Sequence, residues 1–263
     1  AETLRDLGRY DEALAAFEET MRRFPQDEVA PTARAETLRD LGRYDEALAA
    51  FEETMRRFPH DLVARSAYAC ILGEQGRIEE VEALLKFAVA QPRTDSDWIA
   101  AHILAMTKLR AGRIDEALIQ LDRGAKNCAF RNTRAYFESA RSLAILANRR
   151  AAEASKQLES LARGPLLPRE EAANIVLFQA HALAESGEPR RARMLVESAQ
   201  IIVFAVAKQR RLAAALSERY GLVSGVPASA ERAQQLAGDI ATLEFQLACP
   251  KLWSFRTHLA RAA

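Results

Sequence analysis

The fold is decided by a stretch of sequence that occurs twice. Residues 1–25 read AETLRDLGRYDEALAAFEETMRRFP, and residues 35–59 repeat them without a difference. A diverged copy continues the pattern, because Gly76 follows Gly42 at the same spacing as Gly42 follows Gly8. A short fixed period is typical of repeat architectures, in which each repeat is one small unit of secondary structure.

Each copy predicts two short amphipathic helices joined by a tight turn. In the first copy, apolar side chains recur at intervals of three and four residues, which indicates a helix with one buried stripe. A glycine precedes this helix, where the chain takes the positive φ that often ends a helix, and a proline follows it. Helices this short are marginal alone, so neighbouring pairs must stack to bury their stripes. We place the small residues Ala13, Ala47 and Ala117 where two helices cross closely.

These positions resemble the second half of a tetratricopeptide repeat (TPR) motif, as in a bacterial-type TPR array. The matching residues in the first copy are Gly8, Tyr10, Ala13, Phe17 and Pro25. The small residue of the motif's first helix falls on Ala35, Ala69, Ala105, Ala140 and Ala180. The resemblance covers about residues 1–205, and it implies an all-α, right-handed α-solenoid of helix-turn-helix repeats.

The chain is expected to have two parts. Residues 1–205 form a TPR-like array of about six helix pairs, of which the first is incomplete, and the fifth turns at residues 148–150 without a glycine. Residues 206–263 form a helical C-terminal cap or a degenerate repeat. There, Ser229 is expected to cap a helix over 230–248, and residues 252–262 are expected to form a last helix.

Composition excludes several classes of function. The net charge is +1, so no global field attracts nucleic acid or a membrane surface. The longest apolar run covers residues 201–207, far short of a membrane span, and no signal peptide is visible. Three widely spaced cysteines suit a reducing compartment, so we expect a cytoplasmic protein.

Motifs for catalysis and cofactor binding are missing from the sequence. It has no phosphate-binding glycine loop, no HExxH or CxxC metal motif and no GxSxG nucleophile motif. The four histidines lie far apart and are interpreted as polar groove or packing residues. We therefore expect no enzyme, no catalytic residues, no cofactor and no metal.

The resemblance implies that the first helices of the repeats line a concave groove that holds a peptide or helix of a protein partner. The groove residues are then Thr32, Glu36, Arg39, Asp40, Ser66, Cys70, Glu74, His102, Met106, Arg110, Asn174 and His181. Some TPR domains grip the terminal carboxylate of a peptide with a clamp of lysine and asparagine. The clamp positions here hold other residue types, which disfavours a receptor for such tails.

The leading hypothesis is therefore a protein-interaction scaffold. One alternative is the sensor or regulatory arm of a larger signalling or catalytic polypeptide, because Ala1 enters partway through a first helix and the motif expects about seven more residues upstream. A second alternative is binding of single-stranded RNA, which the basic cluster at 208–211 supports weakly.

Two further observations concern association. Residues 1–93 carry a net charge of −6 and residues 94–263 a net charge of +7, which fits a partner of mixed charge or head-to-tail self-association. The incomplete first repeat is also expected to expose an apolar edge, through which copies of the chain could stack end to end.

Overall fold

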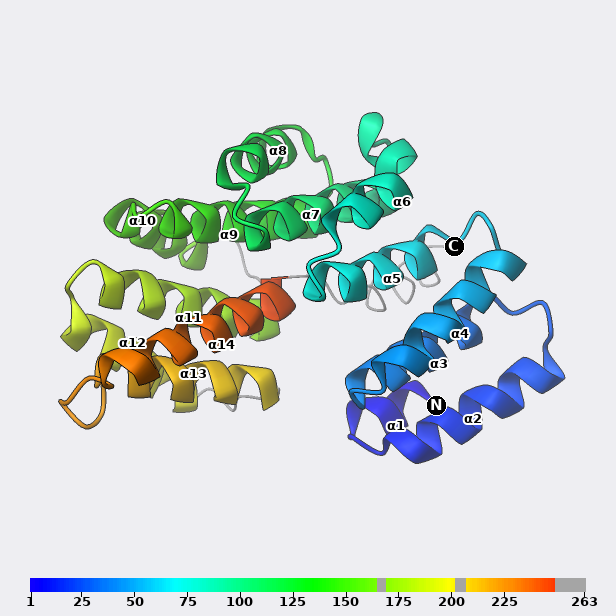
Figure 1. The fold of residues 1–263 in the computed structure, drawn as a ribbon, viewed down its shortest axis with the longest axis horizontal. Coiled ribbons are helices and arrows are strands. Elements are labelled where there is room, and N and C mark those ends of the chain that lie inside the picture. Colours follow the sequence, from blue (N-terminus) through cyan, green and yellow to red (C-terminus); the bar gives the residue numbers. More distant parts are fainter. Residues whose placement is uncertain (165–168, 202–206, 249–263) are drawn as a thin grey trace. The chain divides into compact units, whose positions relative to one another are not determined.

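The computed structural model describes residues 1–164, 169–201 and 207–248, which form helices and the turns between them (Figure 1). Within these ranges there are fourteen helices and no strand. In chain order they are α1 (Glu2–Asp6), α2 (Tyr10–Arg23), α3 (Val29–Asp40), α4 (Tyr44–Arg57), α5 (Leu62–Glu74), α6 (Ile78–Ala90), α7 (Asp95–Arg110), α8 (Ile114–Asn127), α9 (Arg131–Ala147), α10 (Ala151–Ala162), α11 (Arg169–Glu185), α12 (Pro189–Ile201), α13 (Ala207–Tyr220) and α14 (Ala230–Ala248). Odd-numbered helices are the first helices of the repeats and even-numbered helices the second. The expected all-α solenoid of helix-turn-helix repeats is confirmed.

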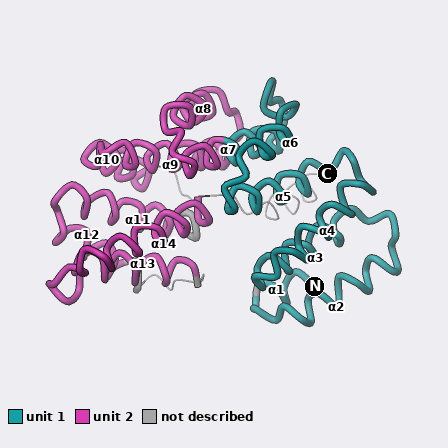
Figure 2. Tube along the Cα trace, viewed as in Figure 1, with its two compact units in different colours: residues 1–104, 251–263 teal, residues 105–250 magenta. Residues whose placement is uncertain are grey.

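The chain divides into two compact units, which Figure 2 shows in different colours. Unit 1 holds residues 1–104, and unit 2 begins at Ala105 and includes the described residues to 248. The division falls inside α7. The boundary between array and cap that the sequence suggests at residue 205 stays a prediction.

Within each unit, helices pack mainly against their neighbours in the chain. In unit 1, α2 packs against α1 and α3, and α4 packs against α3 and α5. Ala13 and Phe17 of α2 form a buried cluster with Ala30 and Ala33 of α3. Ala47, at the position equivalent to Ala13, is also fully buried. The small residues thus lie in the core, as expected for close helix crossings.

The turns between the two helices of each repeat share one hydrogen-bond pattern. At the end of α3, the Gly42 N–H donates to the carbonyl of Arg39, and the next N–H donates to the carbonyl of Leu38, which is a Schellman motif. Gly42 has a φ of 78°, which glycine adopts without steric cost. The fifth turn has the same pattern although Arg149, at a φ of 58°, replaces the glycine. The turn that the sequence suggests at residues 148–150 is therefore confirmed.

The same pattern also ends α13. The Gly221 N–H donates to Glu218, and the Leu222 N–H donates to Ser217. Gly221 follows the turn glycine Gly187 at the same spacing as Gly42 follows Gly8, so the α13–α14 hairpin has the turn and the spacing of a repeat. The Ser229 hydroxyl accepts from the N–H of residue 232, so the cap and the bounds expected for the helix over 230–248, which is α14, are confirmed. The helix expected at 252–262 lies outside the described residues.

An arginine precedes the second helix after most turns and pairs with a glutamate three residues later. In unit 2, Arg113 Nε donates to Glu116 Oε1 at 2.5 Å, and Lys108 Nζ donates to Glu116 Oε2 at 2.9 Å. These two cations lower the pKa of Glu116 to about 2. None of the described helices is both long enough and apolar enough to span a bilayer.

Candidate functional site

The residues predicted to line a groove all lie on first helices. Unit 1 contains those on α3 and α5 and one on α7, and unit 2 contains those on α7 and α11 that follow residue 104. Four of the twelve keep part of their surface exposed, namely Arg39, Asp40, Glu74 and Arg110. The other eight are buried, namely Thr32, Glu36, Ser66, Cys70, His102, Met106, Asn174 and His181.

Thr32 in unit 1 connects two first helices. Its hydroxyl lies 3.1 Å from Asp61 Oδ2. The other oxygen of Asp61 accepts from the Val63 and Ala64 N–H groups and so caps the start of α5. Asp27 caps α3 in the same way, one repeat earlier. The buried side chain of Thr32 therefore helps to hold α3 against α5.

A row of opposite charges lies on the first helices of unit 1. Arg5 Nη1 lies 2.9 Å from Glu36 Oε2, and Arg5 Nε lies 4.0 Å from Asp40 Oδ2. On its other side, Asp40 lies 3.7 Å from Arg39 Nη2. Glu74 takes the position of Asp40 one repeat later. We call these residues the charge ladder: Arg5, Glu36, Asp40, Arg39 and Glu74.

The electrostatics of the charge ladder keep Arg39 charged. Burial acts to lower the pKa of Arg39, but the carboxylates of Asp40, Glu36 and Glu74 outweigh it and raise that pKa. The pKa of Tyr44 is raised as well, first by burial and then by the negative charge of Glu74. At ordinary pH, a charged Arg39 therefore lies near a neutral phenol.

Three of the four predicted groove residues of unit 2 contact the last described helix, α14. Arg110 Nη1 donates to Thr242 Oγ1 at 3.2 Å, and its guanidinium lies 5.5 Å from the centre of the Phe245 ring. Asn174 Nδ2 donates to the Leu247 carbonyl at 3.2 Å. Met106 is buried.

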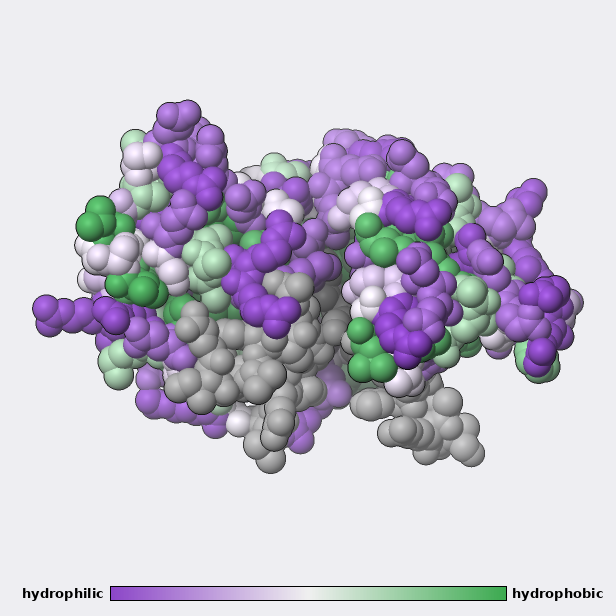
Figure 3. All heavy atoms as spheres, turned by 90° about the horizontal axis from the view of Figure 1, so that it is seen from below, coloured by the Kyte–Doolittle hydropathy of each residue, from purple (hydrophilic) through white to green (hydrophobic). Residues whose placement is uncertain are grey.

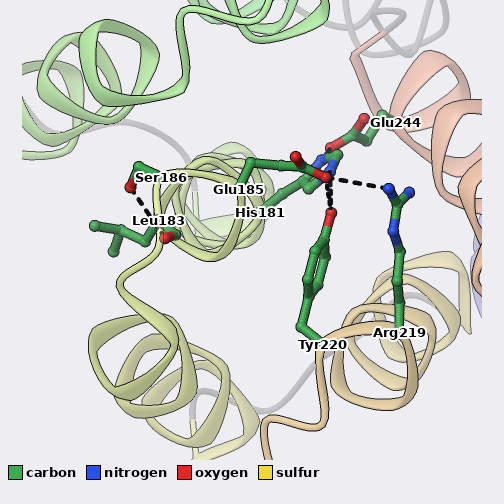
Figure 4. A network of polar contacts seen from close by, with 7 residues as sticks. All are labelled: His181, Leu183, Glu185, Ser186, Arg219, Tyr220 and Glu244. Atoms are coloured by element: carbon green, nitrogen blue, oxygen red, sulfur yellow. Dashed lines mark hydrogen bonds and ion pairs between the residues drawn. The ribbon is translucent and has the colours of Figure 1, made fainter. Parts of the chain in front are cut away.

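His181 is the centre of a polar network between α11, α13 and α14 (Figure 4). His181 Nδ1 lies 2.6 Å from Glu244 Oε1, and Nε2 lies 3.1 Å from the Tyr220 hydroxyl. The same hydroxyl donates to Glu185, which also accepts from Arg219 at 3.1 Å. Burial first, and then the bond to Glu185, raise the pKa of Tyr220, so it stays a neutral donor. The network joins α14 to the two first helices before it.

Among the residues that contact the predicted ones, sequence reasoning missed Arg5 and four residues of α14. Arg5 could have been found, because it holds in the first copy of the repeat the position that Arg39 holds in the second. The others are Thr242, Glu244, Phe245 and Leu247 of α14, more than sixty residues away from any of their partners. No local sequence pattern signals contacts at that distance.

Comparisons with known families agree with this architecture. Two tetratricopeptide repeat models match the chain, one at residues 1–61 and one at residues 38–103. The matched region includes both identical copies and the turn glycines that end α1, α3 and α5. The chain is a tetratricopeptide repeat protein. No curated protein sequence matches this TPR protein.

Two solved structures resemble this TPR protein in fold. A tetratricopeptide repeat protein from Parabacteroides merdae ATCC 43184 is 15% identical, with a TM-score of 0.65 over 80% of this chain and 79% of the other. PilW, a type IV pilus biogenesis factor, is 19% identical, with a TM-score of 0.57 over 80% of this chain and 93% of the other. At such identities the likeness concerns the fold alone.

The surface of the TPR protein seen in Figure 3 is mainly hydrophilic, with hydrophobic residues in small separate groups. Several of the most exposed apolar side chains stand on second helices, namely Phe87 on α6, Ile119 on α8 and Met194 on α12. On the first helices of unit 1, the charge ladder offers partly exposed charges at Arg39, Asp40 and Glu74. TPR proteins in general act as protein-interaction scaffolds, and this ladder is the candidate contact surface.

Proposed function

We propose that this TPR protein is a non-catalytic scaffold that binds a peptide or helix of a partner protein, and that the charge ladder of unit 1 is its main contact. The observation that carries the proposal is the partial exposure of the Asp40 and Arg39 side chains and the distance between them. Their side chains are 25% and 21% exposed, and they lie 3.7 Å apart. That distance is beyond the range of a hydrogen bond, so both groups keep capacity for a partner.

The ladder also fits the chemistry of a charged peptide. Its exposed members are one cation, Arg39, and two carboxylates, Asp40 and Glu74, and carboxylates also outnumber cations in the surrounding residues 1–93. A partner that brings a basic group to Asp40 and Glu74 and an acidic group to Arg39 would match it. Such complementary charges set orientation and partner choice more than raw affinity.

A displayed library of random peptides tests the proposal. Peptides are selected on the whole protein, and their dissociation constants are measured by fluorescence anisotropy against the protein and two double variants. The first variant is Arg39→Gln with Asp40→Asn, which removes one charge of each sign from the ladder. Its matched control is Glu53→Gln with Arg56→Gln, which removes an exposed ion pair from α4.

We expect the ladder variant to weaken binding about tenfold or more, which corresponds to about 1.4 kcal/mol. The α4 control is expected to bind like the parent protein. Circular dichroism checks that all proteins keep their helices. Selected peptides that bind the ladder variant and the parent equally well would refute the proposal.

A further inference from the structure

Helix α14 does not pack like the other second helices of unit 2. Helix α10 packs against α9 and α11, and α12 packs against α11 and α13, so each contacts its own first helix and the next one. Helix α14 packs against α13 but also reaches back to α11 and α9. It therefore lies across first helices of earlier repeats, where Figure 1 shows it beside α11 and α13.

One short segment of α14, residues 242–247, contacts Arg110 of α7 and Asn174 and His181 of α11. This segment supplies a hydroxyl and an aromatic ring to Arg110, and a carboxylate to His181. It also supplies a backbone carbonyl to Asn174, whose own oxygen accepts from Gln209 at 2.8 Å. Each of these first-helix residues thus has a matched partner on α14, and the set is typical of specific recognition rather than of general packing.

We propose that Arg110, Asn174 and His181 form a helix-binding site that α14 occupies within the free protein. The ligand of this site is an amphipathic helix of a partner protein that carries the pattern of residues 242–247. That pattern is a hydroxyl, an acid two residues later, an aromatic residue next to the acid, and a leucine two residues further on. Helix α14 is then an internal competitor that the partner helix displaces.

The connection to α13 makes this competition effective. Residues 221–229 join the two helices, and Val223 and Val226 in this loop are exposed. A tether this short holds α14 near its site at a high effective concentration. A free helix therefore binds only to the small fraction of molecules in which α14 has left, so its apparent affinity is low in the parent protein.

The test uses the whole protein and a fluorescent peptide with the sequence of residues 229–248. In the parent protein we expect weak binding of this peptide. The variant Glu244→Gln weakens the internal contact with His181, while the peptide keeps its own glutamate. The peptide is then expected to bind at least tenfold more tightly, because α14 leaves the site more often. Adding His181→Ala to this variant should abolish the gain.

Three controls separate release of α14 from loss of folding and from binding at unit 1. Asp239→Asn also removes one carboxylate from α14, but Asp239 is exposed, so peptide binding should stay at the parent level. Hydrogen exchange of Glu244→Gln should show faster exchange in α14 with unchanged protection of α11. The ladder variant of unit 1 should bind the peptide like the parent, because this site does not depend on the charge ladder.

Three results would overturn the proposal. One is equal peptide affinity for Glu244→Gln and the parent protein. Another is equal acceleration of exchange in α11 and α14, which would make α14 an inseparable part of the fold. The third is a dimer that forms with rising concentration and that the peptide dissociates, which would make the occupant the α14 of a second copy.

Discussion

Gly124 in α8 and Phe137 in α9 provide a sharp test of how closely two helices approach in unit 2. A Cβ atom added at Gly124 would lie 2.1 Å from Cδ1 of Phe137 and 2.2 Å from Cε1. Phe137 is fully buried, so its ring has little room to move. We therefore expect Gly124→Ala to overpack this crossing, at a cost of about 1–3 kcal/mol in the free energy of unfolding.

The gain in helix propensity opposes this cost and must be removed from the comparison. Alanine stabilises a helix interior by about 1 kcal/mol relative to glycine, so Gly124→Ala alone is expected to lose only up to about 2 kcal/mol. Gly238 in α14 is the matched control, because nothing lies within 4 Å of an added Cβ there. Gly238→Ala keeps the propensity gain without the clash. The difference between the two variants is then the overpacking cost itself.

Urea denaturation followed by circular dichroism measures this difference, and thermal melting provides a second readout. For a chain of this size, a difference of 1–3 kcal/mol corresponds to about 2–12 °C in the melting temperature. Replacing the ring by Phe137→Leu should reduce the penalty of Gly124→Ala in a double-mutant cycle. The reasoning would be refuted if Gly124→Ala and Gly238→Ala changed stability by the same amount.

Three further predictions follow from single sites. Ala47 in α4 is fully buried, whereas Ala49 in the same helix is exposed. In the same melts, Ala47→Leu should therefore lower the free energy of unfolding by about 1–3 kcal/mol and Ala49→Leu by less than about 0.5 kcal/mol. Equal effects of the two substitutions would show that Ala47 does not lie at a close helix crossing. Arg113→Gln should raise the pKa of Glu116 from about 2 toward its ordinary value of 4.5 in a carboxyl NMR titration. Because the pKa of Glu116 is lower in the folded than in the unfolded protein, the stabilisation by the Arg113–Glu116 pair is present above about pH 4.5 and is lost as the pH falls toward 2. An unchanged pKa of Glu116 in Arg113→Gln would exclude this pair as the cause of the lowered pKa. The phenol of Tyr220 should ionise above the ordinary pKa of 10. In an absorbance titration, the change that is lost in the variant Tyr220→Phe belongs to Tyr220, and it should occur at a higher pH than the change of the other tyrosines. An ordinary pKa for Tyr220 would contradict its contact with Glu185.

The hairpins and their turns could be predicted from the sequence, because they depend on contacts within a few residues. Gly42 marks its turn since only a few residue types tolerate a positive φ. Where Arg149 replaces glycine, the helical patterns on either side still placed the turn correctly. The buried position of Ala47 followed from its place in a stripe with helical period.

The surroundings of the predicted groove residues were only partly understood from the sequence. The register placed Glu36, Arg39 and Asp40 together on one helix, and the structure shows them in one electrostatic array. Their neighbour Arg5 was missed, although it holds the same position in the first copy of the repeat as Arg39 holds in the second. The register could not show that Thr32 is used to hold the capping Asp61, because that contact joins two helices of different repeats.

The sequence by itself determined the repeat length, the helix pairs and the positions of the turns. Each of these is a local property that recurs once in every repeat, and its physical causes are periodic burial, glycine conformation and helix capping. Only the tertiary structure decided that α14 lies on earlier first helices. The bond between Arg110 and Thr242 joins residues 132 positions apart, and that pairing depends on how whole helices pack rather than on any repeated pattern along the chain.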